Sequence, residues 1–221
     1  MECAVPAIRP LFPVPFAFDQ HPAPQRLNAA LRTLFLAREH GGDAYANPHP
    51  YTERNAPLFE SRFDLFAWPQ PEIAELREFC LSRTLQLVAE LNGHPPELMR
   101  RLRMNIEAWF HVTRRHGYFG VHNHPNASWS GVYCVDAGKP DVDAPDSGKL
   151  TFLHPHAMSA MHADAGNDTL RPPFNVQHVG YLLEPGQLVL FPSWLLHHVT
   201  PFQGDGERIT VAFNCAFAAP A

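Results

Sequence analysis

The stretch PGQLVLFPSWLLHHVTP, residues 185–201, combines a turn, a strand and two histidines in one short segment. Pro185-Gly186 is a turn signal, and the apolar run 188–191 that follows has the length of a buried strand. His197 and His198 come where this run continues. Because neighbouring residues of a strand point to opposite faces, these two histidines compete for one inward position.

Outward from this segment, strand-length runs separated by turns cover the chain after residue 98. The expected strands are 104–112, 118–122, 128–135, 150–153, 177–183, 188–191 and 209–216. Between them, the acidic, proline-bearing stretch 136–148 is expected to be an exposed loop. Several short strands without intervening helices favour a sandwich or a barrel, so the predicted fold class is mainly β.

Residues 1–98 carry a different pattern. An edge strand is expected near 14–18, and apolar residues at helical spacing predict a helix over 25–40. A second helix is predicted from Pro71, which suits a first turn, to Asn92, before Gly93. We expect one domain over 1–221, in which residues 1–98 form an extension and helices outside a β core at 99–217.

Composition excludes several classes of protein. The 221 residues carry a net charge of −5 and only two lysines, so nucleic-acid binding is not expected. No apolar run is long enough to cross a membrane, and the proline-rich start does not look like a signal peptide. The four cysteines form no CxxC pair, which predicts reduced, buried thiols and a cytoplasmic protein. The oligomeric state stays open, a homodimer included.

A metal site is indicated by His122, His124 and His197. His122 and His124 are two positions apart, so they share a face if the chain is extended there, and His197 is the best third ligand. Imidazole suits iron, zinc, copper and nickel alike, so these residues do not select the metal. Because the chain has 14 histidines, an isolated HxH would be weak evidence for a metal site. The strand that follows it, the distal histidine and a later arginine strengthen that evidence.

That arginine lies in the segment Arg208-Ile209-Thr210. On a strand, Arg208 and Thr210 share a face, where a guanidinium and a hydroxyl can hold a carboxylate. The alternative is a surface strand with its polar residues outside and Ile209 inside, and periodicity alone does not separate the two.

The same segments resemble the 2-oxoglutarate/Fe(II)-dependent oxygenases, in particular a bacterial and phage subgroup with an HxH…H site. The matching stretches are His122–Val135, Gly148–Phe152, Pro185–Pro201 and Glu207–Asn214, within a region of about residues 100–217. The resemblance implies a double-stranded β-helix, or jelly roll, with iron at one mouth. It assigns His122 and His197 as iron ligands and places His124 where the wider family has a carboxylate.

The resemblance also implies Fe(II) as cofactor and 2-oxoglutarate as co-substrate, bound by Arg208 and Thr210. The expected reaction uses O2 to hydroxylate a small-molecule substrate and releases succinate and CO2. Five further residues are candidates for the surrounding pocket, and the first three of them for co-substrate binding: Asn105, Ser130, Tyr133, Trp109 and Ser128.

Two other functions remain open. A three-histidine cupin-type dioxygenase that uses no 2-oxoglutarate would explain the missing carboxylate, and Arg208 would then bind an acidic substrate. A non-catalytic jelly roll that binds a metal or a small anion is the second alternative. The long loop at 154–176, which contains His154 and His156, is a candidate lid or substrate-binding loop.

Overall fold

The computed structural model describes residues 7–55, 57–155 and 162–218 of the chain. Its helices are α1 (Pro24–His40), α2 (Pro71–Asn92) and the short α3 (Pro96–Met99), with 3-10 turns at Gly42–Ala44 and Leu65–Ala67. Its strands are β1 (Ala17–Gln20), β2 (Leu58–Glu60), β3 (Arg103–Thr113), β4 (Phe119–His122), β5 (Trp129–Pro140), β6 (Leu150–Phe152), β7 (Val179–Tyr181), β8 (Gln187–Pro192), β9 (His197–Val199) and β10 (Gly204–Ala218).

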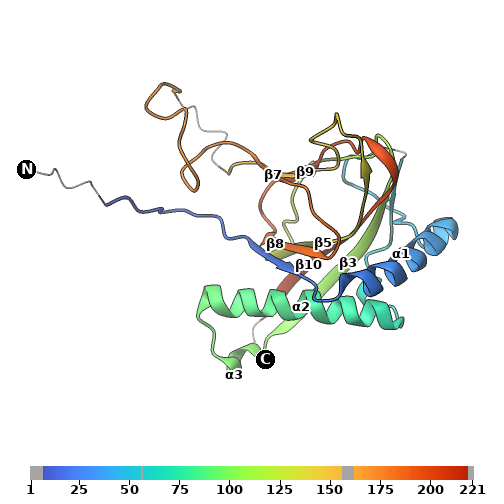
Figure 1. Cartoon of the computed structure of the whole chain (residues 1–221). Helices are drawn as coiled ribbons and strands as arrows, with labels where there is room; N and C mark the ends of the chain where they lie inside the picture. Colours follow the sequence, from blue (N-terminus) through green and yellow to red (C-terminus); the bar gives the residue numbers. More distant parts are fainter. Residues whose placement is uncertain (1–6, 56, 156–161, 219–221) are drawn as a thin grey trace, which may run out of the picture.

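The strands form two antiparallel sheets. A major sheet has the order β1-β8-β5-β10-β3-β2, and a minor sheet has the order β4-β9-β6-β7. Figure 1 shows the helices on one side of the major sheet and the minor sheet on its other side. Since strands distant in sequence, such as β3 and β10, are neighbours in one sheet, this is the topology of a jelly roll. The predicted mainly β fold with helices packed outside is confirmed.

Alternation along β10 separates two environments. Ile209, Val211 and Phe213 are buried in a cluster that includes Leu31 of α1 and Leu76 of α2. Burial of each such side chain stabilises the fold by roughly 1.5–3 kcal/mol. The intervening residues of β10 face the space between the two sheets, so one strand supplies both the helix-facing core and the wall of an interior cavity.

Both long helices have local reasons to form. Each has a proline in its first turn, where the missing N–H leaves no hydrogen bond unmade, and each buries an apolar stripe. The predicted helix over 71–92 agrees with α2 at both ends. It ends at Gly93, whose left-handed conformation (φ 64°) carries no steric penalty in glycine.

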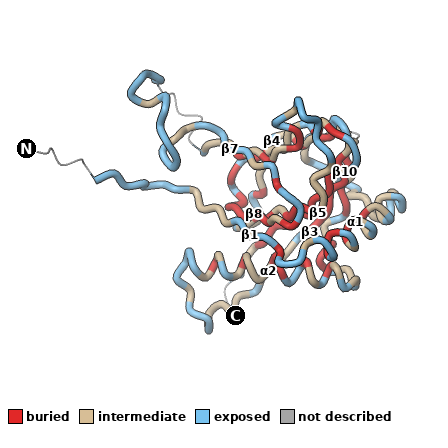
Figure 2. The backbone as a smooth tube through the Cα atoms, viewed as in Figure 1, coloured by how far each residue is buried: buried red, intermediate tan, exposed pale blue. Residues whose placement is uncertain are grey.

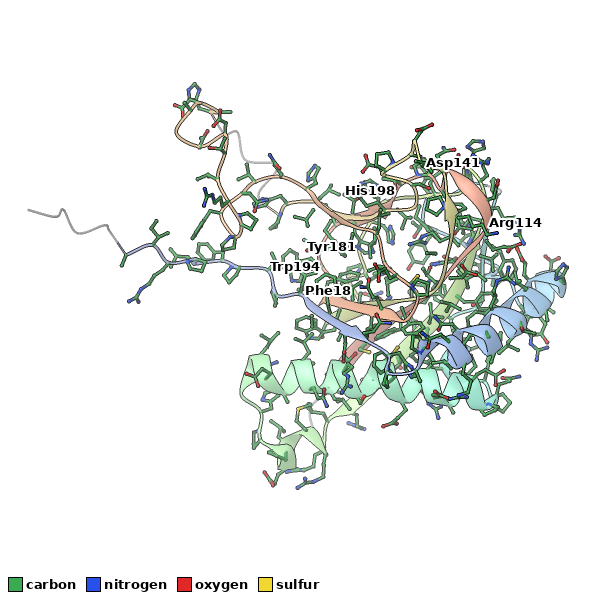
Figure 3. The ribbon with its side chains drawn as sticks, viewed as in Figure 1. Phe18, Arg114, Asp141, Tyr181, Trp194 and His198 are labelled. Carbon is green, nitrogen blue, oxygen red and sulfur yellow. The ribbon has the colours of Figure 1, made fainter. Side chains whose placement is uncertain are left out.

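A second cluster fills the space between the sheets, and it includes Leu150, Phe152, Val189 and Phe191. Figure 2 shows buried backbone concentrated in the strands of the sandwich, whereas the N-terminal segment is exposed. Phe18 of β1 packs on Tyr181 of β7, with ring centroids 4.8 Å apart, so the two sheets also meet at this edge (Figure 3).

The cysteines of the described residues are free and buried, at positions 80, 134 and 215. Burial raises the pKa of Cys134 to about 12, so this thiol stays protonated near neutral pH. No helix in the described part of the chain is both long and apolar enough to cross a membrane.

Several strand predictions differ from the structure in their bounds, and two of them show the physical reason. The expected loop at 136–148 begins late, because β5 continues to Pro140 by pairing with the start of β10, where Gly204 lies opposite Pro140. The expected strand over 177–183 is shorter, because only Val179–Tyr181 pairs with β6. In both cases the partner strand sets the length, and the sequence pattern of one strand does not contain that information.

Candidate metal centre

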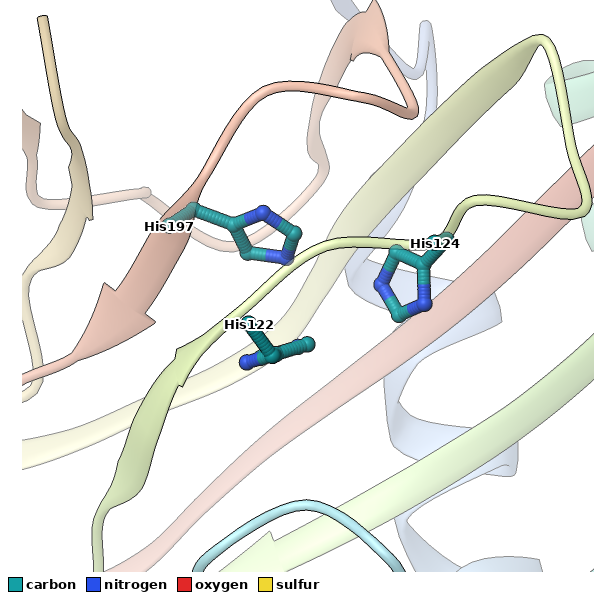
Figure 4. A group of neighbouring side chains, drawn as sticks. All are labelled: His122, His124 and His197. Carbon is teal, nitrogen blue, oxygen red and sulfur yellow. The ribbon is translucent and has the colours of Figure 1, made fainter.

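Three histidines meet at one end of the sandwich. His122 ends β4 and lies directly opposite His197, which begins β9. His124 follows two residues after β4, where its backbone N–H donates to the carbonyl of Ser193 at 2.9 Å. One nitrogen of each ring lies within 4.8 Å of the others. Figure 4 shows the three rings turned towards a common point, an arrangement that can hold one metal ion.

Hydrogen bonds select the tautomer of two of these rings. Nδ1 of His122 lies 2.8 Å from the carbonyl oxygen of Gly120, and Nδ1 of His197 lies 2.9 Å from that of Leu195. Since a carbonyl oxygen can only accept, each Nδ1 carries the proton and donates. Each Nε2 therefore keeps its lone pair, as a metal ligand requires.

The protonation state also suits a metal. Burial lowers the pKa of His122, and it lowers that of His197 well below the ordinary value. Burial, together with the neighbouring His122, lowers the pKa of His124 to about 4. All three rings are therefore neutral near pH 7, so no proton competes with a cation for the ligand nitrogens.

His124 differs from the other two in that its Nδ1 is buried without a hydrogen-bond partner among the described residues. An unsatisfied buried polar atom costs about 1–3 kcal/mol, so its presence in a polar cluster points to a missing group. A cation bound by the three rings fits this arrangement, because it would give each ring a partner that the polypeptide lacks.

His198 is placed on the other side of β9. It is half-buried and its Cα lies opposite Thr151 of β6, whereas His197 is only 4 % exposed. The alternation of the strand therefore separates the two adjacent histidines, and His197 is the one that joins the cluster.

A cavity extends from the histidines between the two sheets, and Arg208 lies in its wall. Arg208 is 7 % exposed and makes no ion pair with any carboxylate of the described residues. Burial lowers the pKa of its guanidinium, because the charged form is poorly solvated there. Thr210, also buried, lines the same cavity. A buried cation without a counter-ion is costly and is suited to binding an anion.

Gly148 makes room for this arginine. It has a positive φ of 64°, and a Cβ atom there would lie 2.8 Å from Cδ of Arg208 and 3.0 Å from Nε. Any other residue at this position would push the guanidinium aside, so Gly148 supports the cavity by packing directly against Arg208.

The other residues that the sequence predicted for the pocket lie in different places in the structure. Ser130 lines the cavity, and its hydroxyl contacts Ser193 Oγ at 2.8 Å and Asn214 Oδ1 at 2.7 Å. Trp109 lines the cavity as well. Asn105 instead lines a neighbouring cavity, whose wall includes His124.

Tyr133 requires a correction, because it does not line either cavity. Its ring is fully buried on the helix side of β5, and its hydroxyl donates to Asn28 Oδ1 of α1 at 2.8 Å. The physical reason is the alternation of the strand, since residues 130 and 133 are an odd number of positions apart and face opposite sides. Ser128 likewise lies outside the cavity lining, and His156 lies outside the described residues.

Some cavity residues have no counterpart in the sequence predictions. Glu60 of β2 lies opposite His111 of β3, and both line the cavity. Burial alone would raise the pKa of Glu60, but the adjacent His111, a hydrogen bond from Asn47 and the charge of Arg54 together lower it. Alternation from Asn105 along β3 could have indicated His111, but Glu60 lies on a three-residue strand with little pattern of its own.

Comparison with known proteins agrees with this geometry. Residues 107–214 match the family described as "Putative 2OG-Fe(II) oxygenase". These residues form a 2OG-Fe(II) oxygenase domain. The match contains the three histidines, Arg208 and Thr210, so the resemblance seen in the sequence is confirmed at the level of the family.

Several solved structures share the fold of this oxygenase domain and its helices. AviO1 from Streptomyces viridochromogenes superimposes with a TM-score of 0.58 at 20% identity, covering 95% of this chain and 93% of that one. A prolyl-4-hydroxylase from Pseudomonas putida gives 0.57 at 18% identity and 92% of both chains. HygX from Streptomyces hygroscopicus, with nickel, 2-oxoglutarate and hygromycin B bound, gives 0.57 at 14% identity, covering 92% of this chain and 83% of that one. No curated protein matches the chain.

Proposed function

We propose that this 2OG-Fe(II) oxygenase hydroxylates a small, polar substrate, with Fe(II) held by His122, His124 and His197. Arg208 and Thr210 would hold the distal carboxylate of 2-oxoglutarate. The observation that carries this proposal is the buried, unpaired guanidinium of Arg208, which shares one cavity with the three imidazoles.

Arg208 favours a dicarboxylic co-substrate for an electrostatic reason. A guanidinium in a poorly solvated cavity gains most from an anion that pairs with it bidentately. One carboxylate of 2-oxoglutarate would meet Arg208, and its keto-acid end would then be directed towards the metal. In this orientation the hydroxyl of Thr210, which lies on the same face of β10 as Arg208, would donate a hydrogen bond to the bound carboxylate.

When bound, Fe(II) and 2-oxoglutarate supply the oxidising chemistry, in which 2-oxoglutarate and O2 yield succinate, CO2 and a hydroxylated product. The polypeptide positions these groups and excludes water. Phe191, Val199 and Leu150 form apolar walls of the cavity, so the reacting groups would be shielded from bulk solvent.

A ligand set of three neutral histidines distinguishes the proposed site from the wider family. It leaves a bound metal one unit more positive than a carboxylate ligand would. The nearest carboxylate in the strand after the HxH pair is Asp136 of β5, which accepts a hydrogen bond from Arg32 of α1 at 3.0 Å and does not join the cluster. His124 therefore remains the best candidate for the position that a carboxylate takes in the wider family.

The neighbouring cavity supports a polar substrate. It has a volume of about 120 Å³, and its wall includes Asn105, Glu107, Asn126 and Asn214. His124 borders both this cavity and the one that holds Arg208, so a substrate bound here would lie next to the metal. Three amides and one carboxylate, with no lysine or arginine in the wall, favour a neutral or cationic polar substrate over an anion.

The three-histidine set also favours one second candidate, a cupin-type dioxygenase that uses no 2-oxoglutarate. Anaerobic titration of the apoprotein with Fe(II) and then 2-oxoglutarate separates the two functions. We expect a weak visible charge-transfer band that needs both components. Iron binding without this band would favour the cupin-type dioxygenase, with Arg208 as a substrate anchor.

The variant Arg208→Ala tests the role of the arginine. We expect 2-oxoglutarate affinity to fall by roughly 30- to 100-fold, because one charged hydrogen-bonding group is lost. Arg115→Ala is the matched control, since Arg115 pairs with Asp141 on the surface. Equal 2-oxoglutarate affinity in Arg208→Ala and the wild type would contradict the proposed clamp.

A further inference from the structure

The three histidine rings are held in different ways. His122 and His197 are oriented by their own Nδ1 hydrogen bonds to backbone carbonyls. The His124 ring has no such bond, and its Nδ1 has no partner among the described residues. Something other than a hydrogen bond must therefore orient the ring of His124.

Besides the rings of His122 and His197, the ring of His124 contacts that of Trp109. The His124 ring meets the Trp109 ring in an edge-to-face arrangement, with centroids 5.8 Å apart and planes inclined at 64°. Trp109 is 4 % exposed and also packs on Phe63, at a centroid distance of 4.4 Å. The indole can thus act as a fixed wall for His124, provided that the indole itself is held in place.

Trp109 is held by His111, two positions along the same face of β3. Trp109 Nε1 donates to His111 Nε2 at 2.8 Å, and the His111 ring packs on Phe119 at a centroid distance of 4.4 Å. The indole N–H can only donate, so this bond requires an unprotonated Nε2. Burial lowers the pKa of His111 and favours the neutral ring that the bond requires.

Glu60 contacts the same nitrogen of His111. Its Oε2 lies 3.2 Å from His111 Nε2, while Oε1 accepts from Asn47 Nδ2 at 2.7 Å and contacts Arg54 Nη1 at 3.0 Å. Glu60 is 6 % exposed, so these partners offset the cost of burying its charge. The four side chains Glu60, His111, Trp109 and His124 form one continuous row from β2 to the metal centre.

We infer that Trp109 and His111 are positioning residues that orient His124 for metal binding. This inference rests on the proposed function, in which His124 is a metal ligand. Groups that orient a ligand commonly change metal affinity by 10- to 100-fold when they are removed. Since His122 and His197 carry their own orienting bonds, the effect should be confined to the His124 position.

The test uses Trp109→Phe, which keeps an aromatic wall but removes the N–H donor. We expect the dissociation constant of the apoprotein for Co(II) to rise about 10-fold, and the visible Co(II) spectrum to change because one ligand is displaced. Trp68→Phe is the matched control, because the indole of Trp68 donates to Asp64 at 3.1 Å outside the cavity.

A second pair of variants separates positioning from folding. His111→Leu removes the acceptor and should weaken Co(II) binding as Trp109→Phe does, whereas His111→Gln keeps an acceptor and should restore part of the affinity. Circular dichroism and the melting temperature establish that each variant is folded. Trp109→Phe and His111→Leu proteins that are folded and bind Co(II) with wild-type affinity and spectrum would overturn the inference.

The variant His124→Ala distinguishes the failure of this inference from the failure of the proposed function. If His124→Ala lost Co(II) affinity and Trp109→Phe did not, only the positioning role would be wrong. If His124→Ala bound Co(II) as the wild type does, His124 would not be a ligand, and both proposals would fall.

Discussion

His122 and His197 lie opposite each other on the paired strands β4 and β9, with ring centroids 4.3 Å apart. They are 75 positions apart in the chain, and the pairing of two short strands brings them together. The metal centre is therefore a product of strand register, since a slip of one residue would turn either ring to the opposite face.

This register predicts unequal effects for two adjacent residues. His197→Ala should lower Fe(II) affinity by more than about 100-fold, because it removes a ligand, whereas His198→Ala should change the affinity less than about threefold. Anaerobic Fe(II) titration of both variants measures the difference. A larger loss in His198→Ala than in His197→Ala would show that the register is wrong.

The close approach of Gly148 to Arg208 gives a second prediction. Gly148→Ala should weaken 2-oxoglutarate binding while metal affinity is retained, because the new methyl group would displace the guanidinium. Gly93→Ala is the control, since Gly93 has the same φ of 64° but open space around its Cβ position. Both changes should cost about 1 kcal/mol of stability from backbone strain alone. Equal 2-oxoglutarate affinity in the two variants would contradict the steric role of Gly148.

The buried neutral histidines predict how stability depends on pH in the metal-free protein. The pKa of His124 is about 4 in the folded chain, below its ordinary value of about 6.5 when unfolded. The unfolded chain therefore binds the proton more readily, so the stabilisation is complete above pH 6.5 and is lost as pH falls towards 4.

Urea unfolding between pH 7.5 and 5 measures this loss. We expect the free energy of unfolding of the wild type to fall by about 2 kcal/mol more than that of His124→Ala over this range. His49→Ala, which changes an exposed histidine, should behave as the wild type does. A pH dependence in His124→Ala identical to that of the wild type would contradict the assignment.

The position of Tyr133 predicts a change in stability without a change in binding. Tyr133→Phe should destabilise the fold by about 1 kcal/mol, because Asn28 would lose the hydroxyl that it accepts from. The affinity for 2-oxoglutarate should stay the same, since Tyr133 faces the helices. Calorimetric titration with 2-oxoglutarate checks this. Weaker binding by Tyr133→Phe than by the wild type would indicate that Tyr133 contributes to the co-substrate site.

Local patterns account for much of what the sequence could predict. The helix over 71–92 follows from a proline at its start, a glycine after its end and an apolar stripe between them. The alternation of side chains along a strand also predicts where Tyr133 lies, because residues 130 and 133 cannot share a face of a regular strand. The prediction for Tyr133 was wrong because it grouped the pocket residues by closeness in sequence and not by whether an even number of positions separates them.

The cavity could not be predicted in the same way. Glu60 contacts His111 across two strands that are 43 residues apart, from Glu60 to Arg103. A carboxylate on a three-residue strand has no periodic signal, and its role depends on the residue opposite it. Gly148 is similar, since only the packing of Arg208 against it shows why a side chain would not fit.

By itself, the sequence determined the two long helices, most of the strands, the HxH…H pattern and the family, because these depend on residues close together or on a motif. The tertiary structure showed that His197 faces inward, as the family resemblance had implied. It alone decided that Arg208 has no counter-ion among the described residues and that Trp109 and His111 lie behind His124. The physical reason is that facing, burial and charge pairing are set by strand register and by packing between distant segments.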